Sequence, residues 1–270
     1  LTTTGNTTGA GGEVFIHHTS AGAADITLGK NVTATGGTSG NGGVVTVYNQ
    51  NGAIALNAPI NVSLGGTGTN DGAIQLKATG NITDASNAGL IGDTSGQLKV
   101  YSTGGKIDLS SSTTNAMKTA SFQTDTTGAD GSVKYYDTSD LTLNTVAAGL
   151  GTLTAPSTAS ANIGATTNAV STVAGSTNGA VTIRAGTTST GTLDVNQAIS
   201  TVSTTANTAG GSVILEANGA ITTAATNGTI TTTGFGNAAG GEVFIDHTAG
   251  VAGAITLNGS ITAKGGTGGT

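Results

Sequence analysis

Gly11-Gly12-Glu13-Val14-Phe15-Ile16 opens a stretch that the chain repeats 229 residues later as Gly240-Gly241-Glu242-Val243-Phe244-Ile245. Residues 1–41 and 230–270 align without a gap and share 23 identical positions. We therefore expect one long unit, residues 1–229, followed by the start of the next copy, residues 230–270, in a natural protein that carries further copies. A sequence that repeats at a fixed period is typical of stacked architectures, in which each unit buries its core against its neighbours.

Within the unit a shorter pattern recurs, in which two apolar residues separated by one residue follow a Gly-rich turn. Alternation with a period of two predicts a strand that is buried on one face. The intervals between successive openings are 31, 29, 24, 35, 48, 32 and 30 residues. The eight openings begin at Val14, Val45, Ile74, Leu98, Val133, Val181, Val213 and Val243.

Further apolar triplets between these openings, such as Ile54-Ala55-Leu56 and Ile107-Asp108-Leu109, predict about three short strands per interval. The sequence thus predicts an all-β fold, a parallel β-solenoid with three short strands per coil of about 30 residues. Seven coils per unit would give a rise of roughly 34 Å at the usual strand spacing. A β-sandwich is the alternative, but it usually has units near 100 residues and aromatic core anchors.

One segment, residues 144–178, fits the pattern poorly. It fills the 48-residue interval and contains Pro156 together with many Ala, Ser and Thr residues. We expect an irregular coil, a protruding loop or an extra coil there, within a solenoid that otherwise continues from residues 1–229 into residues 230–270.

Composition excludes several classes of protein. The 270 residues include 46 Gly and no Cys or Trp, and only 8% are charged, with a net charge of −6. The eight basic residues form no run, so the clustered phosphate contacts that nucleic-acid binding requires are absent. No apolar segment approaches the ~20 residues of a membrane span. Without Cys there are neither disulfides nor Cys-ligated metals.

Three groups of polar residues are candidates for a site. Asp71 ends a Gly-rich stretch, Gly65 to Asp71, that resembles one turn of a calcium-binding β-roll, although the motif stands alone with Asn70 at the acidic position. The pair His17-His18 suggests a metal, but neighbouring side chains in a strand face opposite ways, so a strand-end polar pair is the simpler interpretation. We therefore expect no cofactor and no metal site. A possible ligand or contact patch consists of Asp125, Asp130, Tyr135, Tyr136, Asp137 and Asp140.

Enzymatic and ice-binding functions find little support. A polysaccharide-degrading solenoid needs clustered acids, or basic residues beside acids, in one groove, whereas the fourteen acids here are scattered and Arg184 is the only Arg. Thr-x-Thr pairs suited to ice do not recur at every coil. We expect no enzyme, and both functions remain remote alternatives.

With its Gly-Gly-x-Val-x-Ile, Gly-x-Ile-x-Leu and x-Ile-x-Ala-x-Gly-Gly motifs, the chain resembles the haemagglutinin-repeat, filamentous-haemagglutinin type of bacterial exoprotein. The resemblance is strongest at residues 11–83 and 179–266. It implies a right-handed parallel β-helix, secreted to the cell surface as a long rod for adhesion, aggregation or biofilm formation. The family pattern offers no catalytic residues to carry over.

The sequence accordingly predicts a structural segment of a long extracellular or cell-surface fibre or adhesin stalk, from a bacterium. Its expected partners are other copies of the repeat, lateral or end-to-end associates, and surface glycans. The alternative function is a carbohydrate-binding solenoid that uses the acids and the Tyr135-Tyr136 pair.

Overall fold

The computed structural model describes residues 1–19, 21–125, 131–144, 170–172, 179–186, 191–203, 206–247 and 253–267. These residues form strands, turns and bends but no helix, so the expected all-β class is confirmed. None of the described residues belongs to a helix that could cross a membrane. The strands are β1 (Thr2–Thr4), β2 (Glu13–His18), β3 (Ile26–Leu28), β4 (Val32–Thr35), β5 (Val44–Asn49), β6 (Ile54–Leu56), β7 (Ile60–Asn61), β8 (Ala73–Ala78), β9 (Ile82–Asp84), β10 (Leu90–Ser102), β11 (Ile107–Leu109), β12 (Ala116–Thr124), β13 (Val133–Tyr136), β14 (Leu141–Leu143), β15 (Val170–Thr172), β16 (Val181–Ala185), β17 (Leu193–Val195), β18 (Ile199–Ser200), β19 (Val213–Ala217), β20 (Ile221–Thr223), β21 (Ile230–Thr233), β22 (Val243–His247), β23 (Ile255–Leu257) and β24 (Ile261–Lys264).

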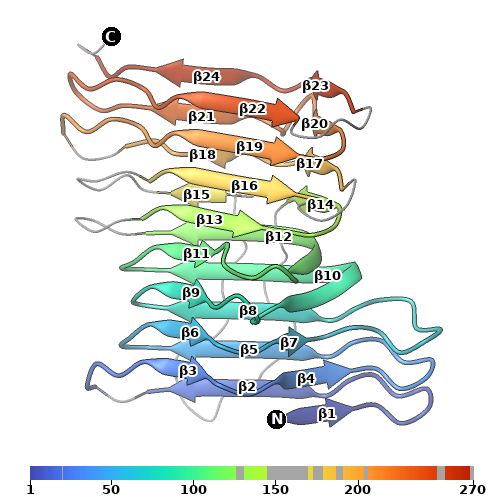
Figure 1. Cartoon of the computed structure of the whole chain (residues 1–270). Coiled ribbons are helices and arrows are strands. Elements are labelled where there is room, and N and C mark those ends of the chain that lie inside the picture. The colour runs from blue at the N-terminus through green and yellow to red at the C-terminus, as the bar shows by residue number, and fades with distance from the viewer. Residues whose placement is uncertain are drawn as a thin grey trace.

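Every strand pair among these residues is parallel, and the strands stack in sequence order from one end of the molecule to the other (Figure 1). A strand pairs with the strand one circuit later in the chain, as β16 does with β19 and β19 with β22. The resulting stack is consistent with a parallel β-solenoid. Its backbone hydrogen bonds run along the stack, so each circuit is held by the circuits above and below it.

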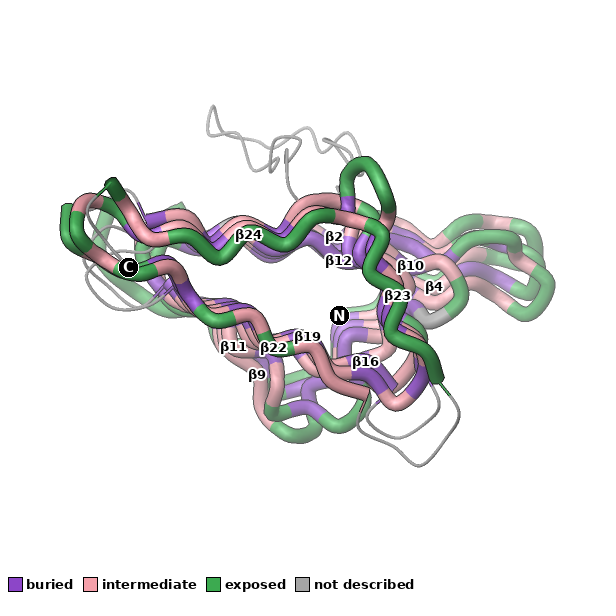
Figure 2. Tube along the Cα trace, turned by 90° about the horizontal axis from the view of Figure 1, so that it is seen from above, coloured by how far each residue is buried: buried purple, intermediate pink, exposed green. Residues whose placement is uncertain are grey.

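The pairings arrange the strands in three columns. Column 1 contains β2, β5, β8, β10, β12, β15, β18, β21 and β24. Column 2 contains β3, β6, β9, β11, β13, β16, β19 and β22, and column 3 runs β1-β4-β7-β10-β12-β14-β17-β20-β23. The long strands β10 and β12 belong to columns 1 and 3 because they continue through the corner between them. Seen along the stack, the three columns enclose the interior (Figure 2).

The core is a set of apolar ladders that follow the stack. In β16 and β19 the burial alternates residue by residue, with Val181 and Ile183 inside, paired in register with Val213 and Leu215. This alternation is what a period-two pattern predicts for a strand with one buried face. Two larger side chains belong to this core, Phe122 of β12 and Tyr135 of β13, whose rings pack with centroids 5.1 Å apart. The core is therefore continuous along the stack.

Buried hydroxyl groups close one corner of the stack, between column 1 and column 2. At the end of a column 1 strand a Thr donates its hydroxyl to the carbonyl of a Gly just before the next column 2 strand. Each bond satisfies a buried carbonyl at a turn where no strand partner reaches it. The four bonds are Thr124 to Gly131 at 2.6 Å, Thr172 to Gly179 at 2.6 Å, Thr201 to Gly211 at 2.5 Å and Thr232 to Gly241 at 2.6 Å.

The expectation that each interval between openings is one coil is wrong at a single place. Leu98 of β10 pairs with Ala120 of β12, whereas Val133 of β13 pairs with Ile107 of β11. The 35-residue interval from Leu98 to Val133 therefore spans one full coil and one additional strand. The reason is that β12 passes the corner at Met117 to Thr119 without a Gly-rich turn, so its column 1 segment has no recognisable opening, whereas β10 has the bulge Gly92 to Gly96 at the same corner.

Most of the irregular segment at 144–178 lies outside the described residues. Its described part includes β15, which pairs in parallel with β12 below and β18 above. Column 1 is thus continuous across this segment.

The inward ladder makes a direct prediction for stability. Truncating Leu215, which is fully buried, to Ala should lower the free energy of unfolding by about 2–5 kcal/mol, because it removes apolar contact and leaves a cavity between coils. The matched control is Ile214→Ala on the outer face of the same strand, for which a change of about 0.5 kcal/mol is expected. Chemical denaturation followed by circular dichroism measures both, and equal losses would contradict the assignment of faces.

Candidate functional site

The structure divides the predicted contact patch between the inside and the outside of the stack. Tyr135 and Asp137 are fully buried, whereas Tyr136 points outward from the same strand. Asp125 and Asp140 are exposed. Asp130 lies outside the described residues. The alternation of side chains along β13 and the turn that follows it separates these residues, so they do not share one surface groove.

Asp137 is the centre of a buried polar cluster. Its carboxylate accepts hydrogen bonds from the Tyr135 hydroxyl at 2.5 Å, the Met117 amide at 2.9 Å, and the amide and hydroxyl of Ser139, each at 2.8 Å. Burial raises the pKa of Asp137 to about 6, because the loss of hydration outweighs these donors. Burial beside this carboxylate also raises the pKa of Tyr135 well above its usual value. The cluster joins two successive coils, and its donors come from buried residues and the half-buried Ser139.

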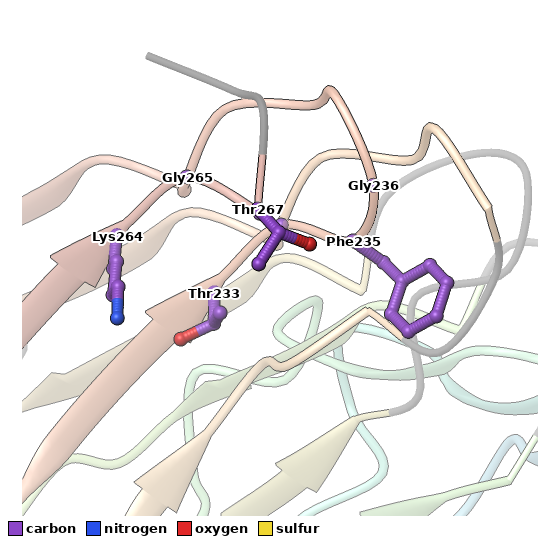
Figure 3. Close-up of a pocket in the computed structure, with 8 residues that line it drawn as sticks. Thr233, Phe235, Gly236, Lys264, Gly265 and Thr267 are labelled. Atoms are coloured by element: carbon purple, nitrogen blue, oxygen red, sulfur yellow. The ribbon is translucent and has the colours of Figure 1, made fainter.

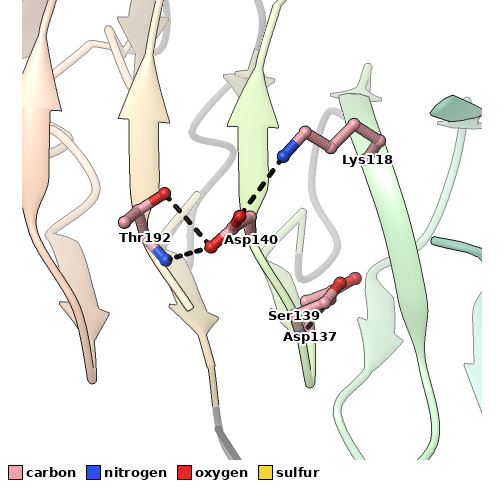
Figure 4. Close-up of polar contacts among 5 residues, drawn as sticks. All are labelled: Lys118, Asp137, Ser139, Asp140 and Thr192. Carbon is pink, nitrogen blue, oxygen red and sulfur yellow. Dashed lines mark hydrogen bonds and ion pairs between the residues drawn. The ribbon is translucent and has the colours of Figure 1, made fainter. Parts of the chain in front are cut away.

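Asp140 is an exposed residue whose carboxylate contacts the two neighbouring coils (Figure 4). It accepts hydrogen bonds from the amide and hydroxyl of Thr192 at 2.8 and 3.3 Å, and it lies 3.5 Å from the ammonium group of Lys118. The Thr192 amide, followed by Lys118, lowers the pKa of Asp140. Its carboxylate is therefore engaged in holding the stack together.

Tyr136 is the outward-facing, half-buried aromatic residue of the predicted patch, and two cations lie over its ring. The Lys134 ammonium lies 5.1 Å from the ring centroid, and the Arg184 guanidinium carbon lies 4.9 Å from it. Arg184 also forms an ion pair with Glu216 on the next coil. A sugar that stacked on this ring would have to displace cations that the ring already attracts.

A second ladder of aromatic and cationic side chains lies on column 1. The ring of His17 stacks on Tyr48 with centroids 4.6 Å apart, and the Lys77 ammonium lies 5.0 Å from Tyr48 and 5.9 Å from Tyr101. The four residues are register partners on β2, β5, β8 and β10. Each stands three residues after the opening of its strand, so aligning the openings with one another would have revealed the ladder in the sequence. The predictions made from the sequence did not include this ladder.

The two histidines have separate neighbours. His17 stacks on Tyr48, while the Nδ1 of His18 lies 3.1 Å from the Oδ1 of the buried Asn49. Burial, followed by the neighbouring His18, lowers the pKa of His17. The two rings therefore do not converge on one ligand.

Asp71 is bound by backbone donors. Its carboxylate accepts hydrogen bonds from the amides of Leu64 at 2.7 Å, Thr94 at 2.6 Å and Ser95 at 2.7 Å. Calcium is bound by six to eight oxygen ligands, whereas the groups that surround this carboxylate are N–H donors. In the described ranges, no three His, Asp or Glu side chains come together in a way that could hold a metal ion.

A hollow of about 250 Å³ lies at the last corner of the stack, lined mainly by backbone and small side chains together with Phe235 and Lys264 (Figure 3). The equivalent corner of the first copy is filled by the Gly-rich loop of the following coil, where the Thr67 amide donates to the Thr38 carbonyl at 2.9 Å and the Gly65 amide to the Gly40 carbonyl at 2.8 Å. Thr267 occupies the position of Thr38 in the repeat. The polar side chains that line the hollow are Thr233, Lys264 and Thr267.

No family model, curated protein or solved structure matches this chain.

The buried carboxyl group of Asp137 predicts an acid-favoured stability. Because the folded protein binds this proton more tightly than the unfolded chain, the contribution is complete below about pH 4 and is lost as the pH rises through about 6. The difference in pKa corresponds to about 3 kcal/mol. We expect Asp137→Asn to flatten the dependence of unfolding free energy on pH between pH 4 and 6, as measured by urea denaturation.

Asp140→Asn is the matched control for this measurement. The folded-state pKa of Asp140 is lowered, so its contribution is present at neutral pH and is lost on acidification. Its removal should therefore leave the acid-favoured slope in place. An Asp137→Asn variant that keeps the slope would show that another group causes it.

Proposed function

We propose that the chain is a structural segment of a long repetitive fibre or adhesin stalk, built as a right-handed parallel β-helix with three short strands per coil of about 30 residues. The observation that carries this proposal is the continuity of the stack between the two copies of the repeat. β22 of the second copy pairs with β19 of the first through five consecutive register partners, Val213 to Ala217 with Val243 to His247. A unit that joins its own next copy in this way can extend a rod without a linker.

The chemistry of the described side chains supports a spacer. The polar groups predicted to bind a ligand are engaged within the stack: Asp140 with Lys118 and Thr192, Asp71 with three amides, and Tyr136 with Lys134 of its own strand and Arg184 of the next coil. Such contacts stiffen the stack. They leave few aromatic faces and carboxylates in the described residues for a carbohydrate or a reaction, which favours the spacer over the carbohydrate-binding and enzymatic alternatives.

The proposal also covers the location and the role of the protein. A rod of this kind suits a secreted or cell-surface protein of the haemagglutinin-repeat type, in which length and stiffness serve adhesion, aggregation or biofilm formation. Its partners would be the neighbouring copies of the repeat and other rods, which could associate laterally.

Tandem proteins with one, two and three copies of residues 1–229 test this function. Each added unit should lengthen a rigid rod by about 35 Å, because seven and one-third coils each rise by one strand spacing. Negative-stain electron microscopy measures the length, and limited proteolysis measures the resistance of the stack. Micrographs that show separate domains joined by flexible linkers would overturn the proposal. Specific binding to a glycan array that is lost in the Tyr136→Ala variant would also overturn it.

A further inference from the structure

The two copies of the repeat have the same local structure. β1 pairs with β4 in the register Thr2–Thr33, and β21 pairs with β24 in the equivalent register Thr231–Thr262. Three backbone hydrogen bonds also recur with nearly the same length. They are Leu1 N to Asn31 O at 2.9 Å and Ile230 N to Ser260 O at 3.0 Å, Gly5 N to Thr35 O and Gly234 N to Lys264 O at 3.0 Å, and Gly37 N to Gly9 O and Gly266 N to Ala238 O at 2.9 Å.

The equivalent strands nevertheless lie in different columns. β2 belongs to column 1, but its copy β22 belongs to column 2, where it pairs with β19. In the same way, the copy of β3 in column 2 is β23 in column 3, and the copy of β4 in column 3 is β24 in column 1. Figure 2 shows β2 and β24 along one wall and β22 along another. The second copy is thus displaced around the axis by one column.

The displacement follows from the number of strands in the unit. From β2 the chain returns to column 1 seven times, at β5, β8, β10, β12, β15, β18 and β21, and then moves on to column 2 at β22. One unit therefore comprises seven complete coils and one further strand. The additional strand enters between β10 and β13, where β12 runs through a corner without a Gly-rich turn.

We propose that each 229-residue unit turns the surface of the fibre by one column, so that successive copies present the same side chains on three faces in rotation. The first face would recur in the fourth copy. This inference rests on the proposed fibre, since it concerns a chain with more copies. Phe15 and Phe244 illustrate it: they occupy equivalent positions, yet Phe15 points outward from column 1 and Phe244, 51% exposed, from column 2.

The rotation determines what kind of partner the fibre suits. A fibre with its repeated determinants on one face would lie flat on a surface, as binding to an ice crystal or a planar sheet requires. In a fibre whose surface turns by one column per unit, successive copies present each determinant in three different directions. It therefore suits cross-bridging, in which further copies of the fibre bind on several sides and form a bundle or a mesh.

Engineered disulfides within residues 1–270 test the displacement by one column independently of the proposed fibre. Asp108 and Lys134 are register partners on β11 and β13, so their Cα atoms should lie about one strand spacing apart, within the range that a disulfide spans. The double variant Asp108→Cys/Lys134→Cys should cross-link under mild oxidation. The natural chain has no Cys to interfere.

The matched control is Tyr101→Cys/Tyr136→Cys, a pair that would be in register if the openings of β10 and β13 shared one column. We expect it to remain reduced. Cross-linking of this second pair without the first would overturn the inference. Because both results are read within residues 1–270, they hold whether or not a fibre exists.

A second measurement on the same chain uses spin labels at Thr8→Cys and Asn237→Cys, which are equivalent exposed positions in corner loops of the two copies. With rotation, the distance between the labels exceeds the axial rise of about 35 Å, because the loops lie at different corners. A distance equal to the axial rise would place the copies in phase and overturn the inference. In the three-copy tandem protein, gold particles attached to a Cys at the Thr8 position of each copy should project from three sides of the rod in electron micrographs. Gold particles along one edge of a rod of the expected length would refute the rotation but would not contradict the proposed fibre.

Discussion

The structure depends on parallel strand pairing along the stack, in which each strand places its inward apolar residues directly over those of the previous coil. A one-residue slip in this register would turn every inward side chain outward. The ladders of Val, Ile and Leu therefore fix the register and provide the apolar burial at the same time. Because each coil uses the same two neighbours for its hydrogen bonds and for its packing, the coils cannot be stable one at a time.

This constraint explains why the chain can have so few charged and aromatic residues. A flat coil offers little room for large side chains, and like charges directly opposite one another on neighbouring strands repel. Small polar residues instead form the hydrogen bonds to backbone carbonyls at the corners, as the Thr hydroxyls do between columns 1 and 2. Where larger polar groups occur, as at Asp137 or Tyr136, they are partnered with the adjacent coil.

Much of the fold could be predicted from the sequence, because the period-two alternation and the length of the intervals are local signals. The column in which a strand lies is not local. It depends on whether each corner contains a turn, and β12 passes from column 3 to column 1 without a Gly that would mark the corner in the sequence. The candidate site illustrates a related limit. Tyr135 and Tyr136 are adjacent in sequence, and alternation alone indicates that only one of them can face solvent, but the burial of Asp137 two residues later required the structure.

The direction of the hydrogen bonds has a mechanical consequence. They lie parallel to the long axis, so tension applied through the two ends of the stack pulls neighbouring strands apart and loads one coil at a time. A coil of about 30 residues adds about 4.8 Å to the folded length, but its extended chain spans about 100 Å. Under load the rod would lengthen by the successive release of coils from an end, each absorbing work while the remainder keeps its shape. The same stacking that makes the segment stiff at rest makes it an extensible tether under force.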